Sequence, residues 1–346
     1  MRPVFVVGAS RSGTNLLRAL LNAQGDLWIS AETHYFDDLR PRLPGGGRSE
    51  LTGTARETCE HYFLALSHRA YGRGGEPERG SIAADSLRRE ASQRGGTGDA
   101  YFEAFCTLRA QLHGRGRWGE KTPRHVYRIP ELFEAFPDAK VIGLVRDPRA
   151  VVASYRDWHL SDIRDGLDEG DEAGLAAEHE RSRRSYHPLL LSLLWRGVVA
   201  AEEEALARFG PERVRLQRFE DLAAAPETAA RRLCDWLGIG FRPEMLEIPI
   251  VNSSYAADER GVSAAPVGRW RQKLPARDLA VVQQACRVRM RALGYESEPV
   301  RGASVAHAAA WTTVPFATLR AGLANRRRLG RVVEYVRRRG ALAFSR

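Results

Sequence analysis

The chain has 346 residues, of which 43% are hydrophobic and 28% are charged, a globular composition that excludes a fibrous or wholly disordered protein. Its formal charge of +10 is concentrated in residues 303–346, where nine arginines stand against one glutamate, so the other 302 residues carry only +2. A generally basic surface is therefore excluded, and we predict no nucleic-acid partner.

The cysteines and the apolar runs bear on the cellular compartment. Cys59, Cys106, Cys234 and Cys286 form no C-x-x-C pair, which predicts reduced, buried thiols and neither a disulfide framework nor a zinc site. A buried strand is expected from about residue 3, which leaves no room for a signal peptide, and no run approaches the length of a membrane span. We therefore expect a cytoplasmic protein.

Residues 4–22 predict a strand, a tight loop and a helix in immediate succession. Val4–Val7 is an apolar run typical of a buried parallel strand, residues 8–13 form a polar loop, and leucines at 16, 17, 20 and 21 share one helix face. Backbone N–H groups of such a loop and the positive end of the helix dipole converge on one point. The segment therefore predicts a binding site for a phosphate group.

The loop differs from the ATP-binding version at the positions that handle magnesium and the γ-phosphate. Gly8 and Gly13 keep the glycine spacing, but Thr14 stands in place of the lysine and Asn15 in place of the magnesium-binding hydroxyl. A cation, Arg11, lies inside the loop instead. We therefore expect a phosphate-bearing ligand other than ATP and no metal, with a P-loop kinase that uses ATP and magnesium as the alternative.

A second short strand is predicted over Leu27–Ser30, and it is followed by Glu32 and His34. Site residues of α/β proteins follow strand ends, which makes Glu32 a candidate, although a helix-capping or solvated acid is the favoured interpretation from spacing alone. Beyond them we predict exposed loops and helices, the loops at 41–53, 72–80 and 93–99 and the helices at about 55–70 and 82–112.

The segment Trp118–His125 is short and polar, and it places Lys121 directly before a Thr-Pro turn. The turn would fix this lysine at a strand end, where it would face the phosphate loop. A lysine in a solvated loop is the alternative interpretation.

Lys140–Val145 is another buried strand, and it leads into a helix predicted over 148–158 with Asp147 as its N-cap. Arg146 ends the strand, and Ser154 lies two turns into the helix. Together they would hold a second phosphate beside the helix. The alternative is an arginine paired with a nearby acid and a serine without a special role.

The rest of the chain continues the alternation of strands and helices. We predict a charged loop or loosely packed helix at 160–187, a helix at 189–209, a strand at 214–219 and helices at 226–237 and 276–293. Strands that alternate with helices of this length indicate an α/β fold with a doubly wound parallel sheet flanked by helices.

Two late segments combine cations with apolar residues. Arg269 and Trp270 would clamp a phosphate and cover a purine, with a surface Arg-Trp-Arg stack as the alternative. Residues 319–339 predict an amphipathic basic helix. Such a helix would lie on anionic lipid, contact an acidic partner or pack on the body of the protein.

Three segments, in this order, resemble the sulfotransferases that use 3′-phosphoadenosine 5′-phosphosulfate (PAPS): Arg-Ser-Gly-Thr at 11–14, Arg-Asp-x-Arg at 146–149 with Ser154, and Gly-x-Trp at 268–270. The resemblance is to the branch that includes tyrosylprotein sulfotransferases and bacterial relatives, and it covers about residues 3–295. It implies a P-loop-like three-layer fold over a domain of residues 1–302, followed by a basic helical extension at 303–346. It also implies in-line transfer of a sulfuryl group to an acceptor hydroxyl without a metal.

The resemblance assigns the donor contacts. The 5′-phosphosulfate would be held by residues of the loop and the first helical turn, namely Arg11, Ser12, Gly13, Thr14 and Asn15. Arg146 and Ser154 would hold the 3′-phosphate, which agrees with the two phosphate contacts inferred from the residues themselves. Asn15 departs from the family loop, because it replaces the second threonine.

The resemblance also assigns the chemistry. A glutamate 21 residues after the loop arginine is the base in the tyrosylprotein branch, and here that position is Glu32. Lys121 stands at the position of a catalytic lysine that stabilises the bridging oxygen, and Arg11 would stabilise the transferring group. Cytosolic relatives use a histidine base close to the lysine, so His125 is a second candidate for the base.

Another departure lies ahead of the Gly-x-Trp segment. Cytosolic sulfotransferases carry Arg-Lys-Gly there, whereas this chain has Ser263-Ala264-Ala265, and Arg269 or Arg271 would have to compensate in binding the 3′-phosphate.

The acceptor stays open among a peptide tyrosine, a sugar hydroxyl, a glycolipid and a phenolic metabolite, and the sequence predicts no oligomeric state. A non-enzymatic nucleotide-binding adaptor is the alternative outside the enzymes.

Overall fold

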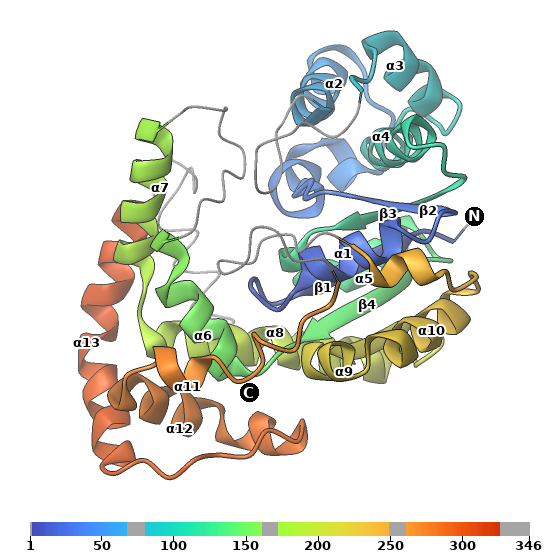
Figure 1. Ribbon diagram of the computed structural model, residues 1–346. Helices are drawn as coiled ribbons and strands as arrows, with labels where there is room; N and C mark the ends of the chain where they lie inside the picture. The colour runs from blue at the N-terminus through green and yellow to red at the C-terminus, as the bar shows by residue number, and fades with distance from the viewer. Residues whose placement is uncertain (1, 68–79, 161–171, 249–260, 326–346) are drawn as a thin grey trace.

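A computed structural model describes residues 2–67, 80–160, 172–248 and 261–325. Its centre is a five-stranded sheet in the order β2-β3-β1-β4-β5, and every strand pair is parallel (Figure 1). The strands are β1 (Val4–Gly8), β2 (Leu27–Ser30), β3 (Arg117–Lys121), β4 (Lys140–Val145) and β5 (Val214–Arg218). The predicted α/β class with a parallel sheet flanked by helices is confirmed.

β3 is the element that sequence patterning described only in part. The prediction for this stretch was a short polar segment with a lysine at a strand end, yet Arg117–Lys121 is a full strand between β2 and β1. Gly119 belongs there because a Cβ at this position would lie 2.4 Å from the Val4 carbonyl oxygen. Pairing with two neighbours, rather than an apolar pattern, makes this segment a strand.

Alternate residues of β1 face two different layers of helices, because successive side chains of a strand point to opposite faces. Phe5 and Val7 pack in a cluster with α4 (Gly98–Leu112) and α8 (Pro188–Phe209). Val4 and Val6 pack in a second cluster with α1 (Thr14–Asn22), α9 (Phe219–Ala224) and α10 (Pro226–Leu237). Both faces of the sheet are therefore covered, which leaves the carboxyl ends of the strands for the site.

The leucines of α1 anchor this helix below the phosphate loop. Leu17, Leu20 and Leu21 are fully buried. Burying a leucine side chain stabilises a fold by about 2 kcal/mol, so the helix that follows the loop is firmly held.

The remaining helices extend from the sheet in two groups (Figure 1). The first group lies near β2 and consists of α2 (Gly53–Ser67) and α3 (Ala84–Ser92). The second group consists of helices that contact one another, namely α6 (Pro148–Arg156), α7 (Glu172–Ser185), α11 (Trp270–Lys273), α12 (Ala276–Ala292) and α13 (Ala303–Ala324). The short helix α5 (Ile129–Ala135) connects β3 to β4. The helix predicted over 82–112 is interrupted at the predicted loop, which separates α3 from α4. None of the helices in the described ranges combines the length and apolar character that a membrane crossing needs.

The C-terminal helix differs from its prediction. The prediction was a helix over 319–339, whereas α13 begins at Ala303 and ends at Ala324, and residues 326–346 lie outside the described part of the chain. α13 packs against α7, α8 and α12. The predicted boundary at residue 302 between a main domain and an extension stays a prediction. The four cysteines are buried free thiols, as predicted.

Candidate active site

Several of the predicted site residues converge at the carboxyl ends of the strands. β1 lies between β3 and β4, which is the point where the strand order reverses and where open α/β sheets bind ligands. Register aligns the strand ends, because Val6 pairs with Lys121 and Gly8 with Leu144. Lys121 therefore ends β3, and the phosphate loop, Arg146 and Glu32 follow β1, β4 and β2 at the same side of the sheet.

Two glycines shape the phosphate loop. Gly8 has φ 144° and Gly13 has φ 97°, values that other residues rarely adopt. A Cβ at Gly8 would also lie 2.6 Å from the Leu144 carbonyl oxygen. Arg11 has φ 71° without being a glycine, a conformation that costs about 1–2 kcal/mol and is typical of binding loops.

The loop contains a buried hydroxyl that suits an anionic ligand. Ser12 is fully buried, and its Oγ has no hydrogen-bond partner among the described residues. A buried polar group without a partner costs about 1–3 kcal/mol, which a phosphate oxygen accepting its hydrogen bond would remove. Asn15 Oδ1 also lacks a partner within the described ranges, but this atom is an acceptor and does not itself point to phosphate. The donor set of the loop thus fits a phosphate or sulfate group.

Arg11, Arg146 and Ser154 lie together beside the loop. The Arg11 Nε donates to Ser154 Oγ at 3.0 Å, and its guanidinium lies 4.1 Å from the centre of the Trp158 ring. One Arg146 Nη donates to the Arg11 carbonyl oxygen at 2.9 Å. The structure thus brings the predicted contacts for the two phosphates into one group, and Arg11 points toward the Ser154 side. We call residues 8–15 with Arg146 and Ser154 the phosphate cluster.

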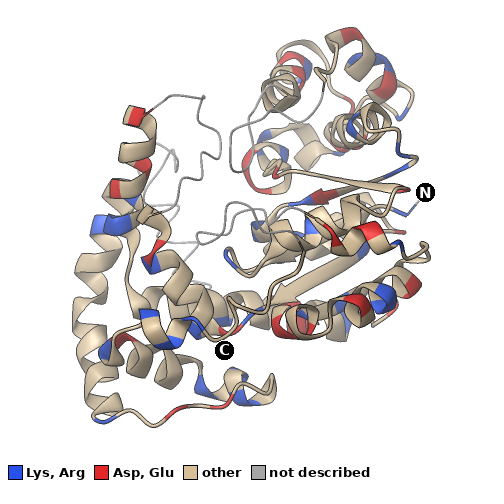
Figure 2. Ribbon diagram, in the orientation of Figure 1, with Lys and Arg blue, Asp and Glu red and all other residues tan. Residues whose placement is uncertain are grey.

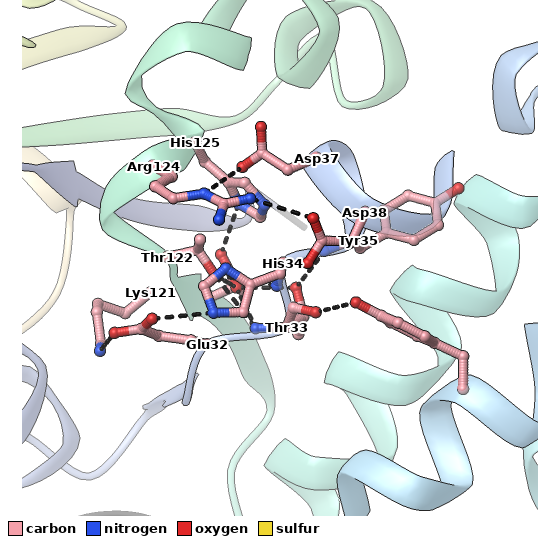
Figure 3. A network of polar contacts seen from close by, with 12 residues as sticks. Glu32, Thr33, His34, Tyr35, Asp37, Asp38, Lys121, Thr122, Arg124 and His125 are labelled. Carbon is pink, nitrogen blue, oxygen red and sulfur yellow. Dashed lines mark hydrogen bonds and ion pairs between the residues drawn. The ribbon is translucent and has the colours of Figure 1, made fainter. Parts of the chain in front are cut away.

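Glu32 contacts Lys121, the other residue to which the resemblance assigns a catalytic role. Lys121 Nζ lies 2.7 Å from Glu32 Oε1, and His34 Nε2 lies 3.2 Å from Glu32 Oε2 (Figure 3). Lys121 is fully buried, whereas 23% of the Glu32 side chain is exposed. The interpretation of Glu32 as a solvated or helix-capping acid is therefore wrong. This carboxylate is ion-paired and still accessible.

The ion pair sets the ionisation of Glu32. Burial alone would raise the pKa of this carboxyl group, because it penalises the charged form. The Lys121 ammonium and the hydrogen bond with His34 outweigh burial and hold the pKa well below its usual value. Glu32 is therefore a carboxylate at neutral pH.

A second carboxylate, Glu120, joins the two segments that carry these groups. It is fully buried and accepts hydrogen bonds from Thr33 N and Thr33 Oγ1, both at 2.9 Å, and from Thr122 Oγ1. Its other oxygen lies 3.1 Å from His125 Nδ1. Burial opposes ionisation, yet the interaction with His125 and the hydrogen bonds from Thr122 and Thr33 lower the pKa of Glu120.

Thr33 follows Glu32 in the chain and Thr122 follows Lys121, so Glu120 connects the backbones that carry both groups. Sequence reasoning missed this role. The available signal is a charged residue inside a strand that must be buried, because such a residue needs partners. We call the set Glu32, Thr33, His34, Glu120, Lys121, Thr122 and His125 the carboxylate network.

His125, the second candidate for the base, is fully buried. Its Nδ1 contacts Glu120, its ring packs edge-on against Phe36, and its Nε2 has no hydrogen-bond partner in the described part of the chain. The imidazole is thus inside the network, whereas Glu32 is partly exposed. A catalytic role of His125 stays a prediction.

Trp270 of the late Arg-Trp cluster packs against α6. Trp270 is 2% exposed and belongs to an apolar cluster with residues of α6. The Arg149 guanidinium lies 4.0 Å from the centre of its ring and that of Arg271 lies 4.4 Å away. These contacts make the indole a support for α6, which carries Ser154. Purine contact by Trp270 and phosphate contact by Arg269 stay predictions.

Pro266, the residue directly after the Ser263-Ala264-Ala265 segment, contacts the phosphate cluster. The Pro266 carbonyl oxygen accepts a hydrogen bond from Arg146 at 3.3 Å. This contact comes from the backbone, so it supplies no cation. Arg146 is thus oriented from this side by a carbonyl group.

A model of the sulfotransferase family matches residues 3–243 of the chain. The chain therefore belongs to the sulfotransferase family, and the predicted resemblance is confirmed at that level. Carbohydrate sulfotransferase 3 of Homo sapiens is 32% identical over 174 residues, which are 46% of this chain and 34% of that protein. The omega-hydroxy-beta-dihydromenaquinone-9 sulfotransferase Stf3 of Mycobacterium bovis is 35% identical over 121 residues, which are 35% and 28% of the two chains.

The match spans about a third of the length of these curated relatives. Among solved structures, the sulfotransferase domain from the curacin biosynthetic pathway aligns with a TM-score of 0.48 at 18% identity. That alignment covers 86% of this chain and 99% of the domain.

Proposed function

We propose that the protein transfers a sulfuryl group from PAPS to a hydroxyl group of an acceptor. The observation that carries the proposal is the convergence, at one edge of the sheet, of a phosphate loop with a buried lysine and an ionised glutamate. The family assignment supports this reaction class and does not favour the kinase alternative.

The phosphate cluster would hold the donor. Its Ser12 hydroxyl, its loop amides and Arg11 suit the 5′-phosphosulfate, and Arg146 with Ser154 suits the 3′-phosphate. PAPS would supply the sulfuryl group and leave as adenosine 3′,5′-bisphosphate. Because Arg11 Nε contacts Ser154, we assign this arginine primarily to donor binding and only secondarily to stabilising the transferring sulfuryl group.

Glu32 would take the proton of the acceptor hydroxyl. An anion bound beside Lys121 competes for its ammonium and so weakens the interaction that lowers the Glu32 pKa most. The proton affinity of Glu32 therefore rises when the donor is bound, which makes the carboxylate a better base at that moment. Lys121 would meanwhile stabilise negative charge on the bridging oxygen from a buried position, where an ammonium acts more strongly than in water.

The names of the relatives bear on the acceptor. One acts on a carbohydrate and the other on an omega-hydroxy dihydromenaquinone. We propose an alcohol hydroxyl, on a sugar or a lipid, as the acceptor class, in preference to a phenol or a peptide tyrosine.

The first experiment measures thermal unfolding with adenosine 3′,5′-bisphosphate plus chelator, beside ADP plus magnesium. Ligand at about 100 times its dissociation constant stabilises a fold by about 2.7 kcal/mol, so the bisphosphate should raise the melting temperature clearly. A rise in melting temperature with ADP and magnesium, but not with the bisphosphate, would favour the kinase alternative. Binding without turnover of PAPS on any sugar, lipid or phenol acceptor would favour the adaptor.

A further inference from the structure

α13 exposes a stripe of large apolar side chains. Val305, Phe316, Leu319 and Leu323 are 74%, 69%, 59% and 55% exposed. Their spacings of 11, 3 and 4 residues place them on one helix face over about 27 Å. The opposite face buries Ala310, Ala317 and Ala321 against the body of the protein. The helix is thus docked through small residues and presents its large apolar ones outward.

The outward face of α13 carries no charge. In this helix, all of which the structure describes, Arg320 is the one arginine, and no lysine or acid is present. Arg320 donates to the Arg184 carbonyl oxygen at 3.0 Å and to the Tyr186 carbonyl oxygen at 3.1 Å, so it is held to the body. Figure 2 shows α13 almost without charged residues, beside charged patches on α7. A solvent-facing helix normally has a polar outer face.

The sequence after the stripe is strongly cationic. Residues 326–346 contain eight arginines and one glutamate, a net charge of +7 within 21 residues. An apolar helix face next to concentrated positive charge is the combination that binds the interface of anionic membranes, because acyl chains accept the apolar residues and headgroups attract the cations. We propose that the apolar face of α13 docks the protein on a bilayer, and the positive charge of the sequence that follows selects a bilayer that contains anionic phospholipid.

The charge favours a bilayer over a second copy of the chain. Parallel pairing of two stripes would bring two segments of +7 side by side, and repulsion would oppose it. An anionic bilayer satisfies the stripe and the arginines with one surface. The inference is independent of the proposed reaction, since it uses no residue of the phosphate cluster or the carboxylate network.

The test is vesicle flotation with neutral phosphatidylcholine and with a mixture containing phosphatidylglycerol. The test variant is the double substitution Phe316→Glu with Leu319→Glu, and the matched control is Val288→Glu, an exposed valine on α12 that is 78% accessible. We expect the wild type to bind the anionic vesicles, the double variant to bind them at least about tenfold more weakly and the control to bind as the wild type does. High salt should weaken all three.

A second measurement reports insertion directly. A fluorophore that brightens in apolar surroundings is attached at Phe316→Cys and, as the control, at Val288→Cys, because the four native cysteines are buried. Emission should rise on anionic vesicles at position 316 only. Equal flotation of the double variant, or no emission change at 316, would overturn the proposal. A concentration-dependent dimer that the double variant abolishes, without vesicle binding, would assign the stripe to a second copy.

Discussion

On the β1 and β4 side of the sheet edge, the phosphate cluster gathers two arginines and a buried hydroxyl that has no partner among the described residues. On the β2 and β3 side, the carboxylate network pairs each carboxylate with a cation or with several donors. The buried hydroxyl of the first region needs an anion as its partner, whereas both carboxylates of the second region are paired without a ligand. The comparison indicates that the first region selects the donor and that the second is preorganised for chemistry.

The comparison also explains how one region would act on the other. Lys121 is the member of the carboxylate network that an anion at the phosphate cluster would attract, because it is the buried cation at the neighbouring strand end.

Lys121→Ala breaks the link between the two regions. We expect turnover to fall by about 10²–10³-fold, because a buried charge at the reacting oxygen is lost, while adenosine 3′,5′-bisphosphate still binds. Turnover and bisphosphate binding are measured on the same preparation. Lys140→Ala is the matched control, since this lysine begins β4 and so lies at the end of the strands opposite to the site. Unchanged turnover in Lys121→Ala would remove the lysine from the mechanism.

Glu120→Gln tests whether the buried carboxylate positions Glu32 and Lys121. An amide cannot satisfy the same donors, so the two segments should shift, and a misplacement of about 1 Å costs up to about 100-fold in rate. We expect kcat to fall by about 10- to 100-fold with unchanged affinity for the bisphosphate. Glu60→Gln is the control, because Glu60 is a buried carboxylate that pairs with Arg88 and Tyr101 away from the sheet edge. Equal losses in both variants would indicate a merely structural role.

The pH profile distinguishes a glutamate base from an imidazole base. Activity is lost as pH falls through the pKa of the base, and the pKa of Glu32 starts well below its usual value. Donor binding raises it toward the ordinary range of a carboxyl group but not beyond, because Lys121 stays adjacent. Turnover should therefore persist at pH 5, whereas an imidazole with an ordinary pKa of about 6.5 would lose about thirtyfold there. A profile that falls near pH 6.5 would contradict the assignment to Glu32.

Much of the phosphate cluster could be predicted because its determinants are local. The apolar run of β1, the glycines at 8 and 13 and the Asp147 cap are adjacent in sequence to what they shape, and Asp147 does accept a hydrogen bond from Arg149 N. A local signal of this kind needs no knowledge of the strand order.

The carboxylate network depends on tertiary contacts instead. Glu32 and Lys121 are 89 residues apart, and they meet because β3 inserts between β2 and β1. Their pairing could be inferred from a family resemblance but not from spacing. Glu120 had no apolar pattern around it, and the burial of Trp270 follows from the packing of α11 on α6. These features are set by neighbours that the local sequence does not identify.

Ser154→Ala weakens the phosphate cluster by one hydroxyl. We expect about tenfold weaker binding of adenosine 3′,5′-bisphosphate, since a hydrogen bond to a charged group contributes about 1.5 kcal/mol or more. Adenosine 5′-phosphate, which lacks the 3′-phosphate, should bind the variant and the wild type alike. Ser92→Ala, an exposed serine at the end of α3, controls for the loss of a hydroxyl elsewhere. An equal loss for both nucleotides would place Ser154 away from the 3′-phosphate.

Glu202 on α8 is the carboxyl group that sharpens the comparison, because it is as buried as Glu120 but lacks donors. Both of its oxygens are without a hydrogen-bond partner among the described residues, and burial, with a smaller effect of Glu203, raises its pKa to about 8. The folded protein therefore holds a proton that the unfolded chain releases above about pH 4.5. The contribution of Glu202 to the free energy of unfolding is complete below about pH 4.5 and is lost as pH rises toward 8.

Glu202→Gln should remove this pH dependence. The wild type should lose about 1 kcal/mol of unfolding free energy between pH 6 and pH 7 relative to the variant, by linkage of protonation to folding. Urea unfolding at the two pH values measures the difference, and turnover at pH 7 should be unchanged because Glu202 lies in the core beside Gly143. Parallel pH dependence in both proteins would mean that Glu202 is ionised in the fold. The contrast with Glu120 would then fail, because donors would not decide whether a buried carboxyl group in this protein keeps its charge.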